Sequence, residues 1–469
     1  MNKWIVFILL VFISMCGSQT PKVFLANDSI PKQIKADFFE NTILKSKLLK
    51  KDDEILLLKH YLKTKSYYTK SKFIEYYMFK GFISDLNEIE KLKILNILRA
   101  IEGKAISDGK SASDKDIIKI AACFPLSGKG ASTGQSNKRG VEIAIEEFEE
   151  KNLLLGKKIE VIYFDTRSNE FDAKKVCEKI IKTDVIGVIG PNWSGNAQVC
   201  APLFQKKKLP TIMTLASRPD LTKIGDYIFR ICFTDDIQGT IMAKYALDKL
   251  KAKSALILFE ELNAFTRSLS VEFEKSFKLG GGQVKTLKFT TRMLETQEGV
   301  DRLLERIKQN PSDVIFLPSY HPTAGPIIKM ARLNGITKPI FLSGDGWGKG
   351  DLLFLSGERH VLGAYSTVNW HPTQTDTRSI NFILRYARKY KVPPYQASAV
   401  SYDATHILLR SIQIANSTEG SKIKNVLKKS TFSGVTGDFI RFNEFGDPIK
   451  PGIIQKIVPF GAIYVATVK

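Results

Sequence analysis

Short apolar runs alternate with amphipathic segments over the last three quarters of the chain, and this alternation constrains the fold more than any other feature. The runs are rich in β-branched residues, as strands buried on both faces are. The segments between them have helical spacing. Alternating strands and helices form a mostly parallel sheet covered on both faces. We therefore expect an α/β fold from Asp116 onward.

The elements expected in this region follow from the same pattern. Strands are predicted at 117–124, 158–166, 185–190, 210–215, 254–261, 314–320 and 339–345. Helices are predicted at 140–150, 172–181, 198–204, 238–250, 267–279, 299–309 and 324–333.

One stretch, from Val185 to Pro202, predicts a binding corner. Its strand ends at Gly190 and Pro191, a tight loop through Ser194 follows, and a helix is expected next. Free backbone N–H groups and the positive end of a helix dipole meet in such a corner. The corner therefore suits an anion such as a carboxylate.

The N-terminus has the pattern of an export signal at residues 1–15, with a positive start and an apolar core too short to span a bilayer. Cys16 follows in a sequence that resembles the lipobox of bacterial lipoproteins, in which the cysteine is lipidated. Met15 departs from that pattern, where a small residue is preferred. An ordinary cleaved signal is the alternative. Both predict a protein of the cell envelope, and the lipobox predicts a membrane-anchored lipoprotein of the periplasm.

A different pattern occupies the region before the α/β part. Residues 16–31 are expected to form a tether, and residues 32–102 a small all-α module of three or four helices. A polar linker at 103–115 follows. The module is interpreted either as a docking site for a protein partner or as a spacer, and the sequence leaves both open.

Charge and cysteine content exclude some functions. The net charge of +22 lacks the Lys/Arg blocks typical of nucleic-acid binding, so we expect a lysine-rich surface and no nucleic-acid partner. No Cys/His cluster indicates a metal, and no cofactor is expected. Cys177 and Cys200 lie in consecutive expected helices; a disulfide is possible, but we expect two buried free thiols.

Several motifs, in this order and spacing, resemble the periplasmic leucine/isoleucine/valine-binding protein family. The resemblance begins at about Asp116 and leaves out the helical module. The residues that carry it are Ile118-Lys119-Ile120, Pro125-Leu126-Ser127-Gly128, Gly134, Gly140, Gly190-Pro191 with Ser194, Arg218-Pro219-Asp220-Leu221-Thr222, Tyr227-Ile228-Phe229-Arg230, Asp235-Asp236-Ile237-Gln238-Gly239 and Ser401-Tyr402-Asp403-Ala404.

The resemblance implies a type I periplasmic-binding-protein fold with two lobes, three crossovers and a Venus-flytrap hinge that closes on a ligand. Lobe 1 is expected at about 116–232 and 372–447, and lobe 2 at about 237–366. The crossovers are expected near residues 230–236, 366–372 and 447–456.

The resemblance also implies ligand-binding residues. Ser194 and Ser217, with backbone N–H groups near Leu215, match the positions that hold an amino acid's carboxylate. Tyr320 matches an aromatic of the second lobe, and Asp345 matches the acid that pairs with the ammonium group, which is commonly Glu. Thr133 replaces an aromatic found in some members, which puts the side-chain preference in doubt.

Other roles for these residues stay open at this point. The two serines are also good helix N-caps, and Asp345 lies between glycines in a possible turn. Tyr320 is expected either at the ligand or packed on the lobe surface. Trp193 and Trp347 are expected either as walls of the ligand pocket or as core residues.

No catalytic set accompanies these residues, so we expect a binding protein and not an enzyme. A G-x-S-x-G match at 130–134 lies away from the strand, and we interpret it as a glycine-rich loop and not a nucleophile elbow. The leading hypothesis is capture of an amino acid or similar solute for an ABC importer. The alternative is a lipoprotein that regulates a partner, such as an activator of peptidoglycan synthesis, because the layout of the chain resembles such proteins.

Overall fold

The computed structural model describes residues 117–151, 153–154, 157–347, 351–373, 376–459 and 461–468. The expected signal peptide, Cys16, the tether, the helical module and the linker lie outside the described residues. Within the described part of the chain, no helix is long and apolar enough to cross a membrane.

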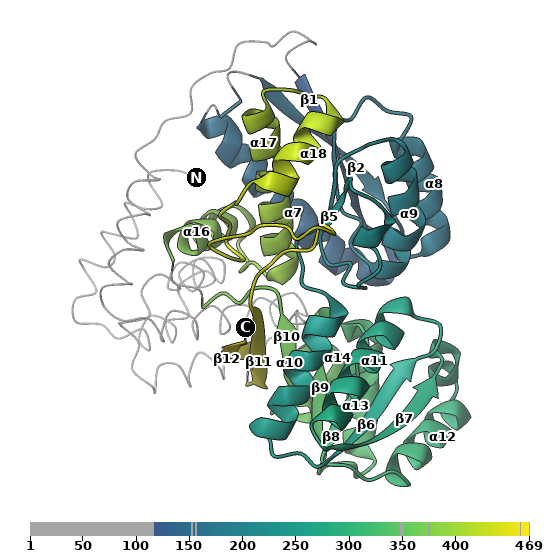
Figure 1. Ribbon diagram of the computed structural model, residues 1–469. Helices are drawn as coiled ribbons and strands as arrows, with labels where there is room; N and C mark the ends of the chain where they lie inside the picture. Colours follow the sequence, from purple (N-terminus) through teal and green to yellow (C-terminus); the bar gives the residue numbers. More distant parts are fainter. Residues whose placement is uncertain are drawn as a thin grey trace, which may run out of the picture. The chain divides into compact units, whose positions relative to one another are not determined.

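Two sheets organise the described residues, and Figure 1 shows each with its own helices. The first is a five-stranded parallel sheet in the order β2-β1-β3-β4-β5. The second has seven strands in the order β12-β11-β10-β9-β8-β6-β7, with antiparallel pairing only along β10, β11 and β12. We call the part built on the first sheet lobe 1 and the part built on the second sheet lobe 2.

The strands of lobe 1 are β1 (Ile117–Phe124), β2 (Lys158–Asp165), β3 (Val188–Ile189), β4 (Thr211–Met213) and β5 (Ile228–Arg230). Those of lobe 2 are β6 (Ser254–Glu260), β7 (Gln283–Phe289), β8 (Val314–Phe316), β9 (Ile340–Ser343), β10 (Tyr365–Val368), β11 (Gly452–Val458) and β12 (Gly461–Val468). The α-helices are α7 (Ala131–Glu150), α8 (Glu170–Ile180), α9 (Ser194–Lys206), α10 (Asp235–Asp248), α11 (Ala264–Leu279), α12 (Gln297–Lys308), α13 (His321–Leu333), α14 (Asp351–Ser356), α15 (Glu358–Val361), α16 (Thr377–Tyr390), α17 (Gln396–Ala415) and α18 (Gly420–Lys429).

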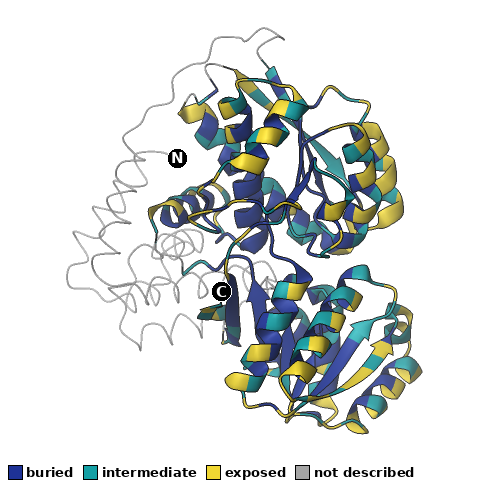
Figure 2. Ribbon diagram, in the orientation of Figure 1, coloured by how far each residue is buried: buried dark blue, intermediate teal, exposed yellow. Residues whose placement is uncertain are grey.

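Each sheet has an apolar core on both of its faces, because alternate residues of a strand point to opposite sides. In lobe 1, Ile120 and Ala122 of β1 pack with residues of α7, α17 and α18, whereas Ala121 and Cys123 pack with α8 and α9. Lobe 2 repeats the arrangement, with α12, α13 and α14 on one face and α10 and α11 on the other. Figure 2 shows the inner strands of the sheets mostly dark and the outer faces of the helices exposed. The predicted α/β fold is confirmed.

Three segments cross between the lobes, as the type I fold requires. They connect β5 to α10, β10 to α16, and α18 to β11. The second crossover starts after Val368 and the third ends before Gly452, because β10 and β11 both pair within the sheet of lobe 2.

Most helices begin earlier than the apolar spacing predicts. Helix α9 starts at Ser194, since the Ala197 N–H already donates to the Trp193 carbonyl at 2.8 Å. Helix α7 starts at Ala131, which corrects the interpretation of residues 130–134 as a loop: the G-x-S-x-G match is the first turn of a helix. The early turns contain small and polar residues, which pack closely on neighbouring segments and carry no periodic signal.

The cysteines also differ from the prediction. Cys177 of α8 and Cys200 of α9 form a disulfide, so the expectation of free thiols there is wrong. The two helices lie side by side on one face of the lobe 1 sheet, which brings the side chains together. The Sγ atom of Cys123 lies 3.9 Å from that of Cys177, and burial raises the pKa of the Cys123 thiol to about 12.

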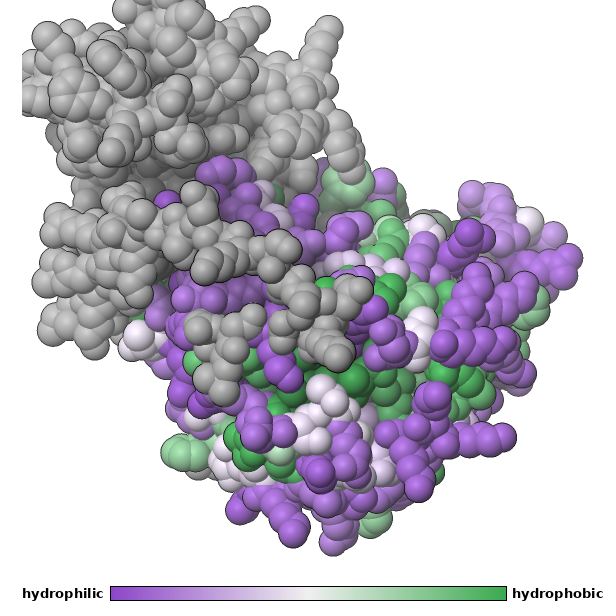
Figure 3. Space-filling view, turned by 90° about the horizontal axis from the view of Figure 1, so that it is seen from above, coloured by the Kyte–Doolittle hydropathy of each residue, from purple (hydrophilic) through white to green (hydrophobic). Residues whose placement is uncertain are grey.

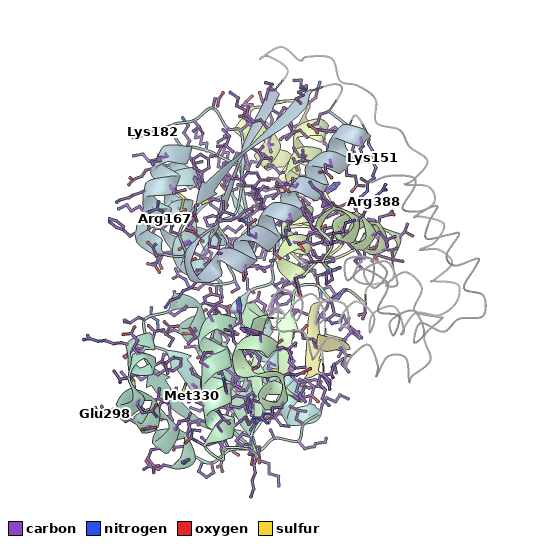
Figure 4. All side chains as sticks on the ribbon, turned by 180° about the vertical axis from the view of Figure 1, so that it is seen from behind. Lys151, Arg167, Lys182, Glu298, Met330 and Arg388 are labelled. Carbon is purple, nitrogen blue, oxygen red and sulfur yellow. A yellow bond between two sulfur atoms is a disulfide. The ribbon has the colours of Figure 1, made fainter. Side chains whose placement is uncertain are left out.

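Polar side chains cover much of the face shown in Figure 3, with smaller apolar areas between them. The labelled side chains Lys182 of lobe 1 and Glu298 of lobe 2 project outward in Figure 4, and both are exposed. This distribution is consistent with charge spread over a solvated surface.

Candidate functional site

The corner that follows β3 lies where the sequence predicts it, but its loop is shorter. Residues 190–193 connect the strand to α9, with Trp193 just before the helix and Ser194 as its first residue. Ser194 is fully buried, and its Oγ accepts the Arg218 N–H at 3.3 Å. Since Ser194 is not the N-cap of α9, the alternative role as a cap is wrong for this serine.

Ser217 follows β4 on the neighbouring strand end and precedes no helix directly. Its side chain is fully buried and lies beside Asp235, where the hydroxyl opposes the rise that burial causes in the pKa of that carboxyl group. Ser217 therefore lies behind the strand ends of lobe 1, next to the start of α10.

Lobe 2 contributes Asp345, the first residue of a short 3-10 helix (Asp345–Trp347) just after β9. The side chain is buried, and one carboxylate oxygen accepts the Asn369 amide at 2.9 Å. Its backbone N–H donates to Gln238 Oε1 at 2.8 Å. Gly344 permits that approach, since a Cβ there would lie 2.8 Å from the same oxygen.

Asn369 and Gln396 join this carboxylate to the crossovers and to lobe 1. Asn369 lies just after β10, and its Oδ1 accepts the Phe233 N–H of the first crossover at 3.1 Å. Gln396 begins α17 in lobe 1, donates to the Asp345 carbonyl at 2.6 Å and accepts the Asn369 N–H at 2.8 Å. The orientation of Asp345 is therefore coupled to the hinge between the lobes.

A second buried carboxylate, Asp235, lies nearby at the start of α10. It is fully buried, and the hydroxyls of Ser217 and Ser268 lie beside its carboxyl group. Burial raises the pKa of Asp235 to about 6, and the two hydroxyls oppose that rise. Burial, reinforced by the charge of Asp235, raises the pKa of Asp345 to about 7. The buried Lys450 ammonium interacts electrostatically with the carboxyl groups of Asp403 and Asp345, and it donates a hydrogen bond to the Thr436 hydroxyl at 3.2 Å.

Three aromatic rings form a continuous stack across the two lobes. The Tyr320 ring lies between Trp193 of lobe 1 and Phe265 of lobe 2, with centroid distances of 4.9 Å and interplanar angles of 18° on both sides. Tyr320 therefore lies at the cleft, and the alternative position on the outer lobe surface is wrong.

A pocket opens beside this stack. Its walls come from both lobes and from the start of α17, and the residues that line it are Thr133, Trp193, Leu215, Tyr320, His321, Pro322, Asp345, Gly346, Tyr395, Gln396 and Ala397. The pocket brings together four of the expected site residues: Trp193, Leu215, Tyr320 and Asp345. Ser194 and Ser217 lie behind its surface. Trp347 is buried in the core of lobe 2.

Four polar residues around Asp345 had no assigned role in the sequence-based prediction: Asp235, Gln238, Asn369 and Gln396. Asp235 and Gln238 belong to a motif that carries the family resemblance, and a spacing of three residues places both on one side of α10. That spacing is a signal for a shared polar site. Asn369 and Gln396 lie in irregular or newly starting segments and carry no comparable signal.

Two lobes, three crossovers and a pocket walled by both lobes define the class of hinged binding proteins. The sequence profile of the periplasmic binding protein family matches residues 117–462, and the chain belongs to that family. The family consists of substrate-binding proteins of the cell envelope and not of enzymes, which agrees with the expectation from the sequence.

Individual relatives support the same assignment. The leucine-, isoleucine-, valine-, threonine- and alanine-binding protein of Pseudomonas aeruginosa is 22% identical over 71% of this chain and 87% of its own length. Leu/Ile/Val-binding protein homolog 1 of Brucella abortus is 28% identical over 72% of this chain and 89% of its own length. Among solved structures, a leucine-binding protein from Thermotoga maritima is 29% identical, with a TM-score of 0.70, over 75% of this chain and 99% of its own.

Proposed function

We propose that the protein captures a free amino acid in the cleft between its lobes. The observation that carries the proposal is Asp345, a buried carboxylate on the wall of a pocket that Trp193, the residue before α9, also lines. A buried anion is costly unless a cation pairs with it, and the ammonium group of an amino acid supplies that cation. The positive end of α9 and the backbone near Leu215 supply the complementary grip on a carboxylate.

The buried serines support this arrangement from behind the pocket surface. Ser217 lies beside Asp235, and Ser194 orients the Arg218 segment against the start of α9. A zwitterion bound with its carboxylate toward lobe 1 and its ammonium toward lobe 2 contacts both lobes at once. Such a ligand stabilises the closed form, because it binds that form more tightly than the open one.

The names of the relatives support the chemical class of the ligand. The relative from Brucella abortus is named for leucine, isoleucine and valine, and that from Pseudomonas aeruginosa for these three with threonine and alanine. A structure from Streptococcus pneumoniae that is 25% identical, with a TM-score of 0.68, contains isoleucine. That protein is described as the substrate-binding protein of an amino acid transporter. By extension, we propose that this chain delivers its ligand to an ABC importer and is tethered to the membrane through a lipid on Cys16.

A thermal-shift screen of the full chain against the amino acids tests ligand capture. A ligand that binds only the folded protein adds about 2.7 kcal/mol to the free energy of unfolding at 100 times its dissociation constant. We expect a shift with at least one amino acid and none with its N-acetylated form, which lacks the ammonium group. An amino acid and its N-acetylated form that shift the transition equally would contradict the proposal.

A further inference from the structure

We infer that Trp193 limits the pocket to amino acids with small side chains, such as glycine, alanine and serine. The inference rests on the proposed function and narrows its ligand class. It also separates this chain from the relative of Brucella abortus, whose name specifies leucine, isoleucine and valine.

Trp193 occupies the space between the lobes. The residue comes from lobe 1, yet its ring stacks on Tyr320 of lobe 2 at a centroid distance of 4.9 Å. Both residues line the pocket that also contains Asp345. A ring of this size beside the proposed ammonium site leaves less room for the side chain of a ligand.

The position of the indole is held from several sides. Phe265 supports the far face of Tyr320, so the tyrosine ring has no room to retreat. Gly130 lies directly against the indole, because a Cβ at that position would be 2.4 Å from Cζ2 and 2.6 Å from Cη2 of Trp193. The absence of a side chain at Gly130 is what allows the ring to lie there.

The backbone of Trp193 is fixed as well. Its carbonyl accepts the first hydrogen bond of α9, from Ala197 at 2.8 Å, and the next residue, Ser194, is fully buried. Moving the ring out of the pocket therefore requires breaking the stack with Tyr320 by side-chain rotation alone. The stack makes that rotation unfavourable.

The remaining space agrees with a compact ligand. In the pocket, about 40 Å³ is open to the centres of water molecules. This narrow space beside Trp193 favours a compact zwitterion over a ligand with a branched aliphatic side chain. Thr133, which also lines the pocket, adds no bulk comparable to an aromatic ring.

Isothermal titration of the full chain with glycine, alanine, serine, valine, leucine and phenylalanine tests the inference. We expect a small amino acid to bind at least about tenfold more tightly than leucine. One extra methylene group that a pocket does not accommodate changes affinity by about 10- to 200-fold. In Trp193→Ala, leucine is expected to gain at least tenfold relative to alanine. In Trp193→Phe, the ratio of leucine affinity to alanine affinity should lie between those of the unmodified protein and Trp193→Ala.

Phe171→Ala serves as the matched control, because Phe171 is an exposed aromatic of lobe 1, at 69% exposure, and does not line the pocket. This variant should keep the preference order of the unmodified protein. If leucine binds the unmodified protein as tightly as alanine does, the size limit is wrong while amino-acid capture stands. An unchanged ratio of leucine affinity to alanine affinity in Trp193→Ala also overturns it. Failure of every amino acid to bind overturns the proposed function itself.

Discussion

The two walls of the cleft are built in different ways. In lobe 1, Trp193 ends the short connection between β3 and α9, Ser194 begins the helix, and the wall is uncharged. In lobe 2, Asp345 depends on Gln238, which is 107 residues away, and on Asn369 and Gln396 of two other segments. One wall is formed by a local turn, whereas the other is assembled from distant parts of the chain around a charge.

This difference predicts that the two walls contribute differently to ligand binding. A buried charge and its network contribute strongly and depend on pH, whereas backbone groups and neutral hydroxyls contribute less and do not titrate near neutrality. The lobe 1 wall is instead expected to govern which side chain fits. The four predictions below test this contrast, from the largest expected effect to the smallest.

Asp345→Ala should have the largest effect on ligand affinity. Removing the carboxylate leaves the ligand's ammonium buried and unpaired, which costs about 2–5 kcal/mol. Isothermal titration with the best amino acid ligand measures the loss. The control Asp301→Asn changes an exposed acid of α12 and should leave the affinity unchanged. Equal affinities for Asp345→Ala and the control would show that the charged wall does not contribute to ligand binding.

The disulfide offers a test of lobe 1 by itself. Replacing Cys177 and Cys200 together by alanine should lower the free energy of unfolding by about 3 kcal/mol, because the cross-link closes a loop of 23 residues. Chemical denaturation measures this loss. Ligand affinity at a temperature where the variant stays folded should change little, because neither cysteine lines the pocket. A large loss of affinity would show that the lobe 1 wall depends on more than its local turn.

A pH series distinguishes the walls without mutation. The pKa of Asp345 is raised to about 7, and an ammonium ligand requires the ionised form, so affinity should fall about tenfold from pH 8 to pH 6. The free energy of unfolding of the ligand-free protein changes with pH in the opposite direction. The native state holds the proton on Asp345 more tightly than the unfolded chain does, so stability declines as pH rises from about 4 to about 7. Titrations across this range measure the first effect, and denaturant melts without ligand measure the second. In Asp345→Asn, the contribution of this carboxyl group to the pH dependence of affinity and of stability should disappear.

Ser194→Ala should have the smallest effect. The change removes one neutral hydrogen bond, to the Arg218 N–H, which contributes about 0.5–1.5 kcal/mol. We expect an affinity loss of up to about tenfold, with no change in pH dependence. Titrations at pH 6 and pH 8 measure both. A loss as large as that of Asp345→Ala would mean that the two walls contribute equally.

Much of the fold could be predicted from the sequence because buried strands in parallel sheets have continuous apolar runs. Strand β1 was predicted with the bounds that the structure shows. Strand β7, Gln283–Phe289, was missed because it lies at the edge of its sheet and is largely exposed, so its sequence is mixed with lysines. Helix starts were predicted too late, because their first turns contain glycines and polar residues that pack on other segments.

The amino-acid sequence by itself determined the α/β class, the order of the elements and the strand ends from which Ser194, Tyr320 and Asp345 project. These properties follow from local periodicity and from motif spacing, which are written along the chain. Only the tertiary structure decided that Cys177 pairs with Cys200, that Asn369 and Gln396 hold Asp345, and that Trp193 stacks on Tyr320. The physical reason is distance along the chain: these contacts join separate helices, crossovers and lobes, and no local pattern encodes which distant surface a side chain will meet.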